Sequence, residues 1–286
     1  VLTYVSFTFK IQLLQMKIFK NKINLIKEIS KKKDISFVPT MGSIHEGHLS
    51  LIKKAAKESK NVLVSIYVNP KQFNSSVDFK KYPRSLVKDI KLLKKTKIQY
   101  LYIPNKKDIY THRIRTPIYL HKFSNELCGK FRPKHFKGVI NVVNRFLEII
   151  KPKMIYLGQK DFQQLRLIKY HIIKNKIKTK VVSCTTVRSK NGIALSSRNI
   201  KLDKKQIKIA AEIYKFLKKN KKKVLVKIIN NEKLSLINLI KKLGVKKIDY
   251  IKCLNMKTLT VPKNMNENFN IFIAYYINNI RLIDNL

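Results

Sequence analysis

Two histidines, His45 and His48, are the residues whose type and spacing point most directly to chemistry. Three positions separate them, so they share one face if the segment is helical. The β-branched and aromatic run from Asp34 to Val38 predicts a strand before them, and apolar residues recur at helical spacing after them. The pattern therefore predicts a strand, a tight turn and the first turn of a helix. An anion is favoured at such a turn, because free backbone N–H groups and the helix dipole point toward it.

The turn itself contains residues suited to that role. Ser43 and Glu46 match the S-x-x-E capping box, which predicts where the helix begins. Gly42 and Gly47 carry no side chain, so a ligand can approach the backbone there. Two other interpretations remain open. The histidines can be structural, or they can bind zinc, although zinc needs a third protein ligand and none lies nearby in the sequence.

A second turn of the same kind lies at Gly158-Gln-Lys-Asp161, between a strand-like run and a helical pattern. Lys160 is a point charge suited to the α-phosphate in a transition state. Asp161 can accept hydrogen bonds from ribose hydroxyls. Farther along, the segment from Ala194 to Asn199 supplies two hydroxyls and a guanidinium fork, which are good donors to phosphate oxygens. These three residues are Ser196, Ser197 and Arg198.

These segments resemble the pantothenate synthetase family, a branch of the nucleotidyltransferase superfamily that carries the H-x-G-H signature. The resemblance covers the chain from about residue 16 to its end, in family order. Besides PTMGSIHEGH (39–48), it rests on VSIYVNPKQF (64–73), YPRS (82–85), FRPKHFKGV (131–139), YLGQKDFQQL (156–165), ALSSRN (194–199) and RLIDN (281–285).

The resemblance implies a ligase that joins pantoate to β-alanine through a pantoyl adenylate, releasing pyrophosphate and then AMP. ATP is the implied co-substrate, Mg²⁺ accompanies it, and the enzyme is a homodimer. His48 matches the family's proton donor, and His45 and Lys160 complete the expected catalytic set. The residues implied in ATP binding are Met41, Gly42, Ser43, Ile44, His45, Glu46, Gly47, His48, Gly158, Gln159, Lys160, Asp161, Val187, Leu195, Ser196, Ser197 and Arg198.

Other residues are assigned to the remaining ligands. The resemblance points to Gln72 and Gln164 for pantoate and β-alanine, and Asn69 joins them because it lies in a loop after a strand. Asp89 is the expected carboxylate for Mg²⁺, with a solvated place on a surface helix as the other interpretation. The family usually has Glu where this chain has Gln159, so the turn loses one negative charge.

Alternating strand and helix patterns predict an α/β fold with a Rossmann-like doubly wound parallel sheet over residues 16–187. Beyond it, the pattern predicts a smaller C-terminal α+β lid domain over residues 188–286. Residues 104–137 read as irregular. Strands are expected at 35–39, 61–68, 98–103, 154–157, 181–187, 248–254 and 271–276, and helices at 21–32, 45–59, 84–95, 139–150, 161–175, 203–219 and 233–243. The lysine-rich run 218–223 reads as a charged helix end or loop.

The 286 residues include 63 Lys and Arg against 16 Asp and Glu, a formal net charge of +47. Such a charge attracts polyanions, which makes a nucleic-acid-binding protein one interpretation. The lysines are spread along the chain, however, and no zinc-finger or RNP motif is present. Compositional drift toward Lys, Ile and Asn accounts for the charge better, so we expect no specific nucleic-acid partner.

The three cysteines, Cys128, Cys184 and Cys253, are far apart and form no C-x-x-C pair. That usage favours a reducing compartment, and hence the cytoplasm. No run of about 18 apolar residues is present, so no membrane partner is expected. Residues 1–15 lack the features of a signal peptide and read as a non-native or disordered extension, with Met16 as the natural start.

Two further functions compete with the ligase. One is a different H-x-G-H adenylyltransferase, which would form an adenylylated product without needing β-alanine. The other is a catalytically decayed relative, which the retention of nearly every expected contact argues against.

Overall fold

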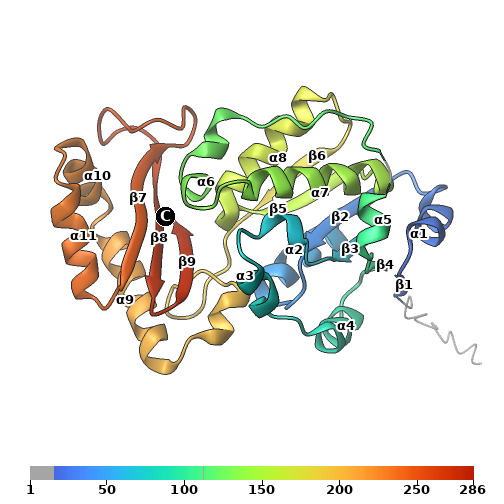
Figure 1. Cartoon of the computed structure of the whole chain (residues 1–286), viewed down its shortest axis with the longest axis horizontal. Coiled ribbons are helices and arrows are strands. Elements are labelled where there is room, and N and C mark those ends of the chain that lie inside the picture. Colours follow the sequence, from blue (N-terminus) through green and yellow to red (C-terminus); the bar gives the residue numbers. More distant parts are fainter. Residues whose placement is uncertain (1–15, 112) are drawn as a thin grey trace, which may run out of the picture.

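A computed structural model describes residues 16–111 and 113–286, and its centre is a six-stranded parallel sheet (Figure 1). The strands run in the spatial order β1-β4-β3-β2-β5-β6. They are β1 (Lys17–Phe19), β2 (Ile35–Thr40), β3 (Asn61–Ile66), β4 (Tyr100–Tyr102), β5 (Met154–Gly158) and β6 (Lys180–Cys184). Every pairing between them is parallel, which confirms the predicted doubly wound sheet.

Helices cover both faces of this sheet, because its strands carry apolar side chains on both sides. Along β3, Leu63 joins one hydrophobic cluster, whereas Val62 and Val64 join another. The first cluster includes buried residues of α1 (Lys22–Ile29), α7 (His135–Ile150) and α8 (Phe162–Lys174). The second includes buried residues of α2 (Glu46–Glu58) and α4 (Leu86–Lys94).

The strand order reverses between β2 and β5. Strands β3, β4 and β1 lie on one side of β2, and β5 and β6 lie on the other. The loops that leave the carboxyl ends of β2 and β5 therefore diverge from adjacent strands and leave a crevice between them. In open α/β sheets this is where ligands bind. The H-x-G-H turn follows β2 and the Gly158–Asp161 turn follows β5, so both open onto this crevice.

The C-terminal part contains a three-stranded antiparallel sheet and three helices (Figure 1). Side chains alternate along β8. Ile271 and Ile273 pack among the helices, whereas Phe272 and Ala274 join the hydrophobic cluster of the larger sheet. The small sheet thus lies between its own helices and the rest of the molecule. Its elements are β7 (Lys247–Asn255), β8 (Phe269–Ile277), β9 (Ile280–Asn285), α9 (Lys204–Lys219), α10 (Lys221–Ile229) and α11 (Lys233–Lys242).

Several elements were not predicted. β1 and β9 are short or mixed in polarity. The lysine-rich run 218–223 does contain a helix end, that of α9 at Lys219, but α10, which begins at Lys221, was not predicted. The supposedly irregular stretch contains α5 (Lys106–Tyr110) and α6 (Cys128–Phe131), and α7 begins at His135, four residues early. The remaining short helix is α3 (Ser76–Lys81). The proposed extension over residues 1–15 lies outside the described residues.

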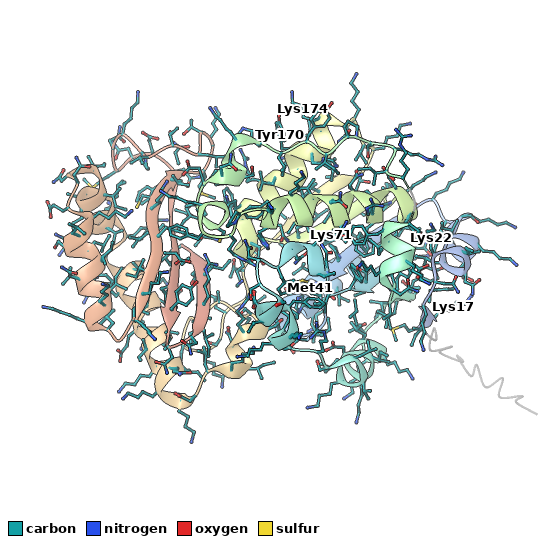
Figure 2. The ribbon with its side chains drawn as sticks, in the orientation of Figure 1. Lys17, Lys22, Met41, Lys71, Tyr170 and Lys174 are labelled. Carbon is teal, nitrogen blue, oxygen red and sulfur yellow. The ribbon has the colours of Figure 1, made fainter. Side chains whose placement is uncertain are left out.

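Long side chains that end in nitrogen project around the outline of the molecule in Figure 2. Lys17 and Lys174, both labelled there, are exposed. Within residues 16–111 and 113–286, no helix has the length and apolar character needed to cross a membrane.

Gly138 marks the closest approach between the start of α7 and the loop after β3. A Cβ atom added there would lie 2.1 Å from the carbonyl oxygen of Lys71. We expect Gly138→Ala to lower the free energy of unfolding by about 1–3 kcal/mol through overpacking, although alanine is the better helix former. Urea unfolding measures this change.

Gly158→Ala is the matched control, because no atom lies within 4 Å of a Cβ at that position. Its free energy of unfolding should stay within about 0.5 kcal/mol of the wild-type value. Equal losses in both variants would contradict the steric explanation.

Candidate active site

A cavity of about 300 Å³ lies at the crevice between β2 and β5. Its lining comes from both sheets: Thr40 and Gly158 end the two parallel strands, and Arg281 and Asp284 belong to β9. A second pocket, between α9 and the small sheet, encloses only about 20 Å³.

A buried carboxylate fixes the backbone conformation of the turn after β2. Asp89 on α4 is 2% exposed, and its two oxygens accept from the backbone N–H groups of Ser43 and Ile44, each at 2.8 Å. The Ser85 hydroxyl donates to the same carboxylate at 3.0 Å. These bonds fix a turn in which Gly42 and Ser43 both have positive φ, at 79° and 51°.

Asp89 therefore does not fit the metal-binding role expected of it. Its side chain is neither solvated nor directed to the cavity, and its oxygens are already occupied by backbone donors. Within the described ranges, no group of three or more His, Cys, Asp or Glu is arranged to hold a metal ion.

The helix start also differs from expectation, because a histidine and not Ser43 caps α2. His45 is the N-cap residue, and its Nδ1 accepts from the backbone N–H of Gly47 at 3.1 Å. His48 Nδ1 accepts in turn from the backbone N–H of His45 at 3.4 Å. Glu46, the other half of the predicted capping box, is exposed in the first turn.

These bonds determine the tautomers of both imidazoles. A backbone N–H can only donate, so Nδ1 of each ring is the acceptor and the proton lies on Nε2. Burial lowers the pKa of His45 to about 4, with Lys160 adding to the effect. Burial and the neighbouring His45 lower the pKa of His48 to about 3. Near pH 7 the cavity therefore has two neutral Nε2–H donors on adjacent rings, whose centroids are 4.0 Å apart.

The turn after β5 is fixed by the last strand of the chain. Asn285, at the end of β9, donates to the carbonyl oxygens of Gln159 at 3.0 Å and Lys160 at 2.9 Å. Lys160 and Asp161 line the cavity, and Lys160 Nζ lies 3.4 Å from Asp161 Oδ1. Gln159 does not line the cavity, so the charge that the resemblance implies is lost at this position would lie outside the cavity.

The Ala194–Asn199 segment folds against the H-x-G-H turn. The Ser197 hydroxyl donates to the carbonyl oxygen of Ser43 at 3.4 Å, and the N–H of Leu195 donates to the carbonyl oxygen of Val187 at 3.0 Å. Val187 and Leu195 both line the cavity, together with Ser196, Ser197 and Arg198. The two hydroxyls and the guanidinium thus line the same cavity as the histidine pair.

Amide side chains and apolar walls form another part of the cavity. Gln72 is 7% exposed and donates to the sulfur of Met41 at 2.8 Å, and Gln164 lines the same space. The walls are the apolar face of α7 and its neighbours, including Val139, Val142, Val143 and Phe146.

Asn69 lies behind this pocket and not in its wall. Its amide group donates to Gln72 and to the carbonyl oxygen of Gly138, and its oxygen accepts from Tyr110 and from the N–H of Lys71. All four hydrogen-bonding positions of the amide are therefore occupied. This geometry favours a role for Asn69 in positioning Gln72 over the expected direct contact with a substrate.

Known proteins are similar to this chain in sequence and in fold. The profile of the Pantoate-beta-alanine ligase family matches residues 14–286. A pantothenate synthetase from Francisella philomiragia is 40% identical over 269 residues, covering 92% of this chain and 94% of its own. One from Francisella tularensis subsp. novicida is 42% identical over 259 residues, covering 89% of this chain and 90% of its own.

This chain belongs to the pantoate-beta-alanine ligase family. Solved structures agree with the assignment. The Francisella tularensis ligase, complexed with beta-gamma ATP and beta-alanine, has a TM-score of 0.80 at 40% identity and covers 95% of this chain and 97% of its own. The Thermus thermophilus pantothenate synthetase has a TM-score of 0.82 at 29% identity, covering 95% of this chain and 99% of its own.

In this pantoate-beta-alanine ligase, the expected ATP residues divide into two groups. The structure brings together at the cavity Met41, His45, Gly47, His48, Gly158, Lys160, Asp161, Val187, Leu195, Ser196, Ser197 and Arg198. Outside its lining are Gly42, Ser43, Ile44, Glu46 and Gln159. The first three of that second group are buried and shape the turn. Ser43 and Ile44 do so through Asp89, whereas the Gly42 N–H donates to the Thr40 hydroxyl at 3.2 Å.

Sequence reasoning missed the roles of Asp89 and Asn285 and the apolar walls of this ligase. Asn285 lies in the RLIDN segment, which marked it as part of the resemblance without showing what it contacts. The apolar residues that recur on one face of the helix predicted over 139–150 could have indicated these walls. Such a face reads equally as ordinary core, because a helix packed on a sheet shows the same pattern.

The depressed imidazole pKa values predict acid sensitivity. His135, 9% exposed, also has its pKa lowered to about 3 by burial and by Arg132. An unfolded chain binds a proton on histidine near pH 6.5, whereas His48 and His135 stay neutral when folded, so the unfolded state holds more protons between pH 6.5 and 3. The stabilisation is complete above pH 6.5 and is lost as the pH falls.

Lowering the pH from 7 to 5 should therefore reduce the free energy of unfolding by about 2 kcal/mol for each such histidine. Urea unfolding at the two pH values measures the loss, and His135→Gln should remove one histidine's share of it. An unchanged pH dependence in that variant would show that His135 titrates normally in the folded protein.

Proposed function

We propose that this protein is an AMP-forming ligase that joins pantoate to β-alanine with ATP as co-substrate. The observation that carries the proposal is one cavity with two chemically different parts. Two neutral histidines, Lys160 and Arg198 form the part suited to phosphates. Amides and apolar walls form the part suited to a small branched hydroxy acid. The β-alanine and ATP analogue bound by the Francisella tularensis relative support the same substrates.

In the first step, a carboxylate oxygen of pantoate attacks the α-phosphorus of ATP. The bond from that phosphorus to the bridging oxygen breaks, and pyrophosphate leaves with the electron pair. Charge builds on the phosphoryl oxygens and the leaving group, where the Nε2–H groups of His45 and His48 can donate and Lys160 can neutralise it. We read the proton-donor role expected of His48 as hydrogen-bond donation to this developing charge. Low imidazole pKa values serve it, because each ring stays neutral and keeps its Nε2–H.

In the second step, the neutral amine of β-alanine attacks the carbonyl carbon of pantoyl adenylate. The C–N bond forms, the C–O bond to the phosphate breaks, and AMP leaves with the electron pair. The proton lost from the nitrogen passes to solvent water. Gln72 and Gln164 would hold the pantoyl hydroxyls and carbonyl, and the valines of α7 would pack against its methyl groups. Both steps depend on positioning and electrostatics and need no covalent enzyme nucleophile.

We further propose that Mg²⁺ enters with ATP, held by phosphate oxygens and water. Mg²⁺ commonly binds in this way beside nucleotides, and the described residues provide no carboxylate cluster dedicated to it. A homodimer and a place in the cytoplasm complete the proposal; the family resemblance supports the first, and the three free cysteines support the second.

The deciding experiment is AMP release from ATP and Mg²⁺, with pantoate and β-alanine supplied separately and together. We expect AMP only when both are present, with pantothenate formed one for one. An adenylylated product made without β-alanine would instead indicate another H-x-G-H adenylyltransferase. Folded protein that binds no ATP and turns over nothing would indicate a decayed relative.

His48→Ala should lower the rate of adenylate formation by about 10²–10³-fold, because a donor to the developing charge is removed. Pantoate-dependent exchange of pyrophosphate into ATP measures this step alone. His121→Ala is the control, since His121 also caps a helical turn through Nδ1 but lies outside the cavity. Equal rates for His48→Ala and His121→Ala would remove His48 from the mechanism.

Gln164→Ala should raise the KM for pantoate by about tenfold or more, since an amide hydrogen bond to the substrate is lost. The KM for ATP should change little. Steady-state kinetics with each substrate varied in turn make the comparison, and a rise in the KM for ATP alone would reassign Gln164 to the nucleotide.

A further inference from the structure

Four cationic side chains line the cavity, and they differ in how well each is paired with a carboxylate. Arg281 Nε lies 2.8 Å from Asp249, whose side chain is 2% exposed. Lys160 Nζ lies 3.4 Å from Asp161 Oδ1, and Arg198 Nη2 lies 3.7 Å from Asp78 Oδ1. Arg132 has the longest pairing, 4.0 Å, and it shares the same Asp78.

Asp78 neutralises Arg132 poorly. The Asp78 side chain is 44% exposed and divides its two oxygens between two guanidinium groups, whereas the Arg132 side chain is only 18% exposed. Burial, Arg198 and Arg281 together lower the pKa of Arg132 to about 10, which still leaves it charged at pH 7. A buried charge without a close partner is costly, so this position favours an additional anion.

The guanidinium is nevertheless held in a defined orientation. His135 Nδ1 lies 2.6 Å from the carbonyl oxygen of Gln72, to which it must donate. Its Nε2 is then the acceptor for Arg132 Nη1 at 3.3 Å, while Arg132 Nη2 donates to the same carbonyl oxygen at 3.4 Å. Both contacts are with neutral groups, so they orient the fork of Arg132 without cancelling its charge.

The phosphates of ATP have their own set of donors. These donors come from segments that converge on the nucleotide turns. They are His45 and His48 at the start of α2, Lys160 after β5 and Arg198 after Ser197. Arg132 instead comes from the segment between α6 and α7 and lies against Gln72, on the side of the cavity assigned to the acid substrate. A planar guanidinium fork matches a carboxylate with two parallel hydrogen bonds.

We propose that Arg132 binds the carboxylate of the amine substrate, with His135 as the residue that positions it. This rests on the proposed function and adds a site to it. Of the three substrates, β-alanine alone keeps a free carboxylate when the amide bond forms. Anchoring that end at Arg132, beside Gln72, leaves the amine at the other end to meet the carbonyl carbon of the adenylate.

Two half-reactions separate this role from a general structural one. Pyrophosphate exchange needs ATP and pantoate but no β-alanine, whereas pantothenate formation needs all three. Arg132→Gln should raise the KM for β-alanine by about 10–100-fold, the loss expected for a charged hydrogen-bonded pair. Exchange should stay within about threefold of wild type, and Arg132→Lys should restore part of the affinity. Arg198→Gln should show the opposite pattern, with exchange reduced.

A substrate analogue tests the same contact in the wild-type enzyme, without any variant. β-Alaninamide has the amine but no negative charge, so its kcat/KM should be about 10–100-fold below that of β-alanine. With this analogue, the wild type and Arg132→Gln should have similar kcat/KM. Equal use of β-alanine and β-alaninamide by the wild type would overturn the proposal.

The remaining outcomes separate this proposal from the function on which it rests. Normal exchange with an unaltered KM for β-alanine in Arg132→Gln overturns the carboxylate site and leaves the ligase intact. Exchange reduced as much as pantothenate formation overturns it as well, because Arg132 then serves ATP or the fold. Absence of exchange in the wild-type protein overturns the ligase itself, and the carboxylate site with it.

Discussion

The carboxylate of Asp89 is the constraint on which the site depends. It accepts the backbone N–H groups of Ser43 and Ile44 and so holds two successive residues, one of them not glycine, at positive φ. Without these bonds the turn would expose unpaired backbone donors inside the protein, which is unfavourable. The direction in which the chain enters α2 follows from this turn, and with it the place of His45.

The capping arrangement changes how an anion meets this helix. Two backbone N–H groups near the helix start are bonded to imidazole nitrogens and are not free for phosphate. Each imidazole accepts a backbone N–H at Nδ1 and carries its own N–H at Nε2. The hydrogen-bond donor offered to an anion is therefore this Nε2–H, farther into the cavity. Burial keeps both rings uncharged, so the pair offers directional hydrogen bonds beside the point charge of Lys160.

The cationic side chains of this protein fall into two groups, those on the surface and those in the cavity. Most of the +47 is carried by exposed lysines such as Lys174, which solvent and salt screen. The cavity cations are different, because buried partners orient them: Asp249 holds Arg281, and His135 with a backbone carbonyl holds Arg132. An excess of surface lysine therefore leaves the geometry of the site unaffected, and the overall charge says little about function.

The sequence by itself determined the parallel α/β sheet, the two phosphate-type turns and the pairing of His45 with His48, because strand and helix periods and short motifs are local properties. Tertiary structure alone decided that Asp89 supports a turn, that Asn69 lies behind Gln72, and that Asn285 holds the Lys160 turn. Each of these depends on contacts between residues 41 to 126 positions apart, in directions set by packing. Residue type shows that a carboxylate or an amide is present; only the fold decides which donor reaches it.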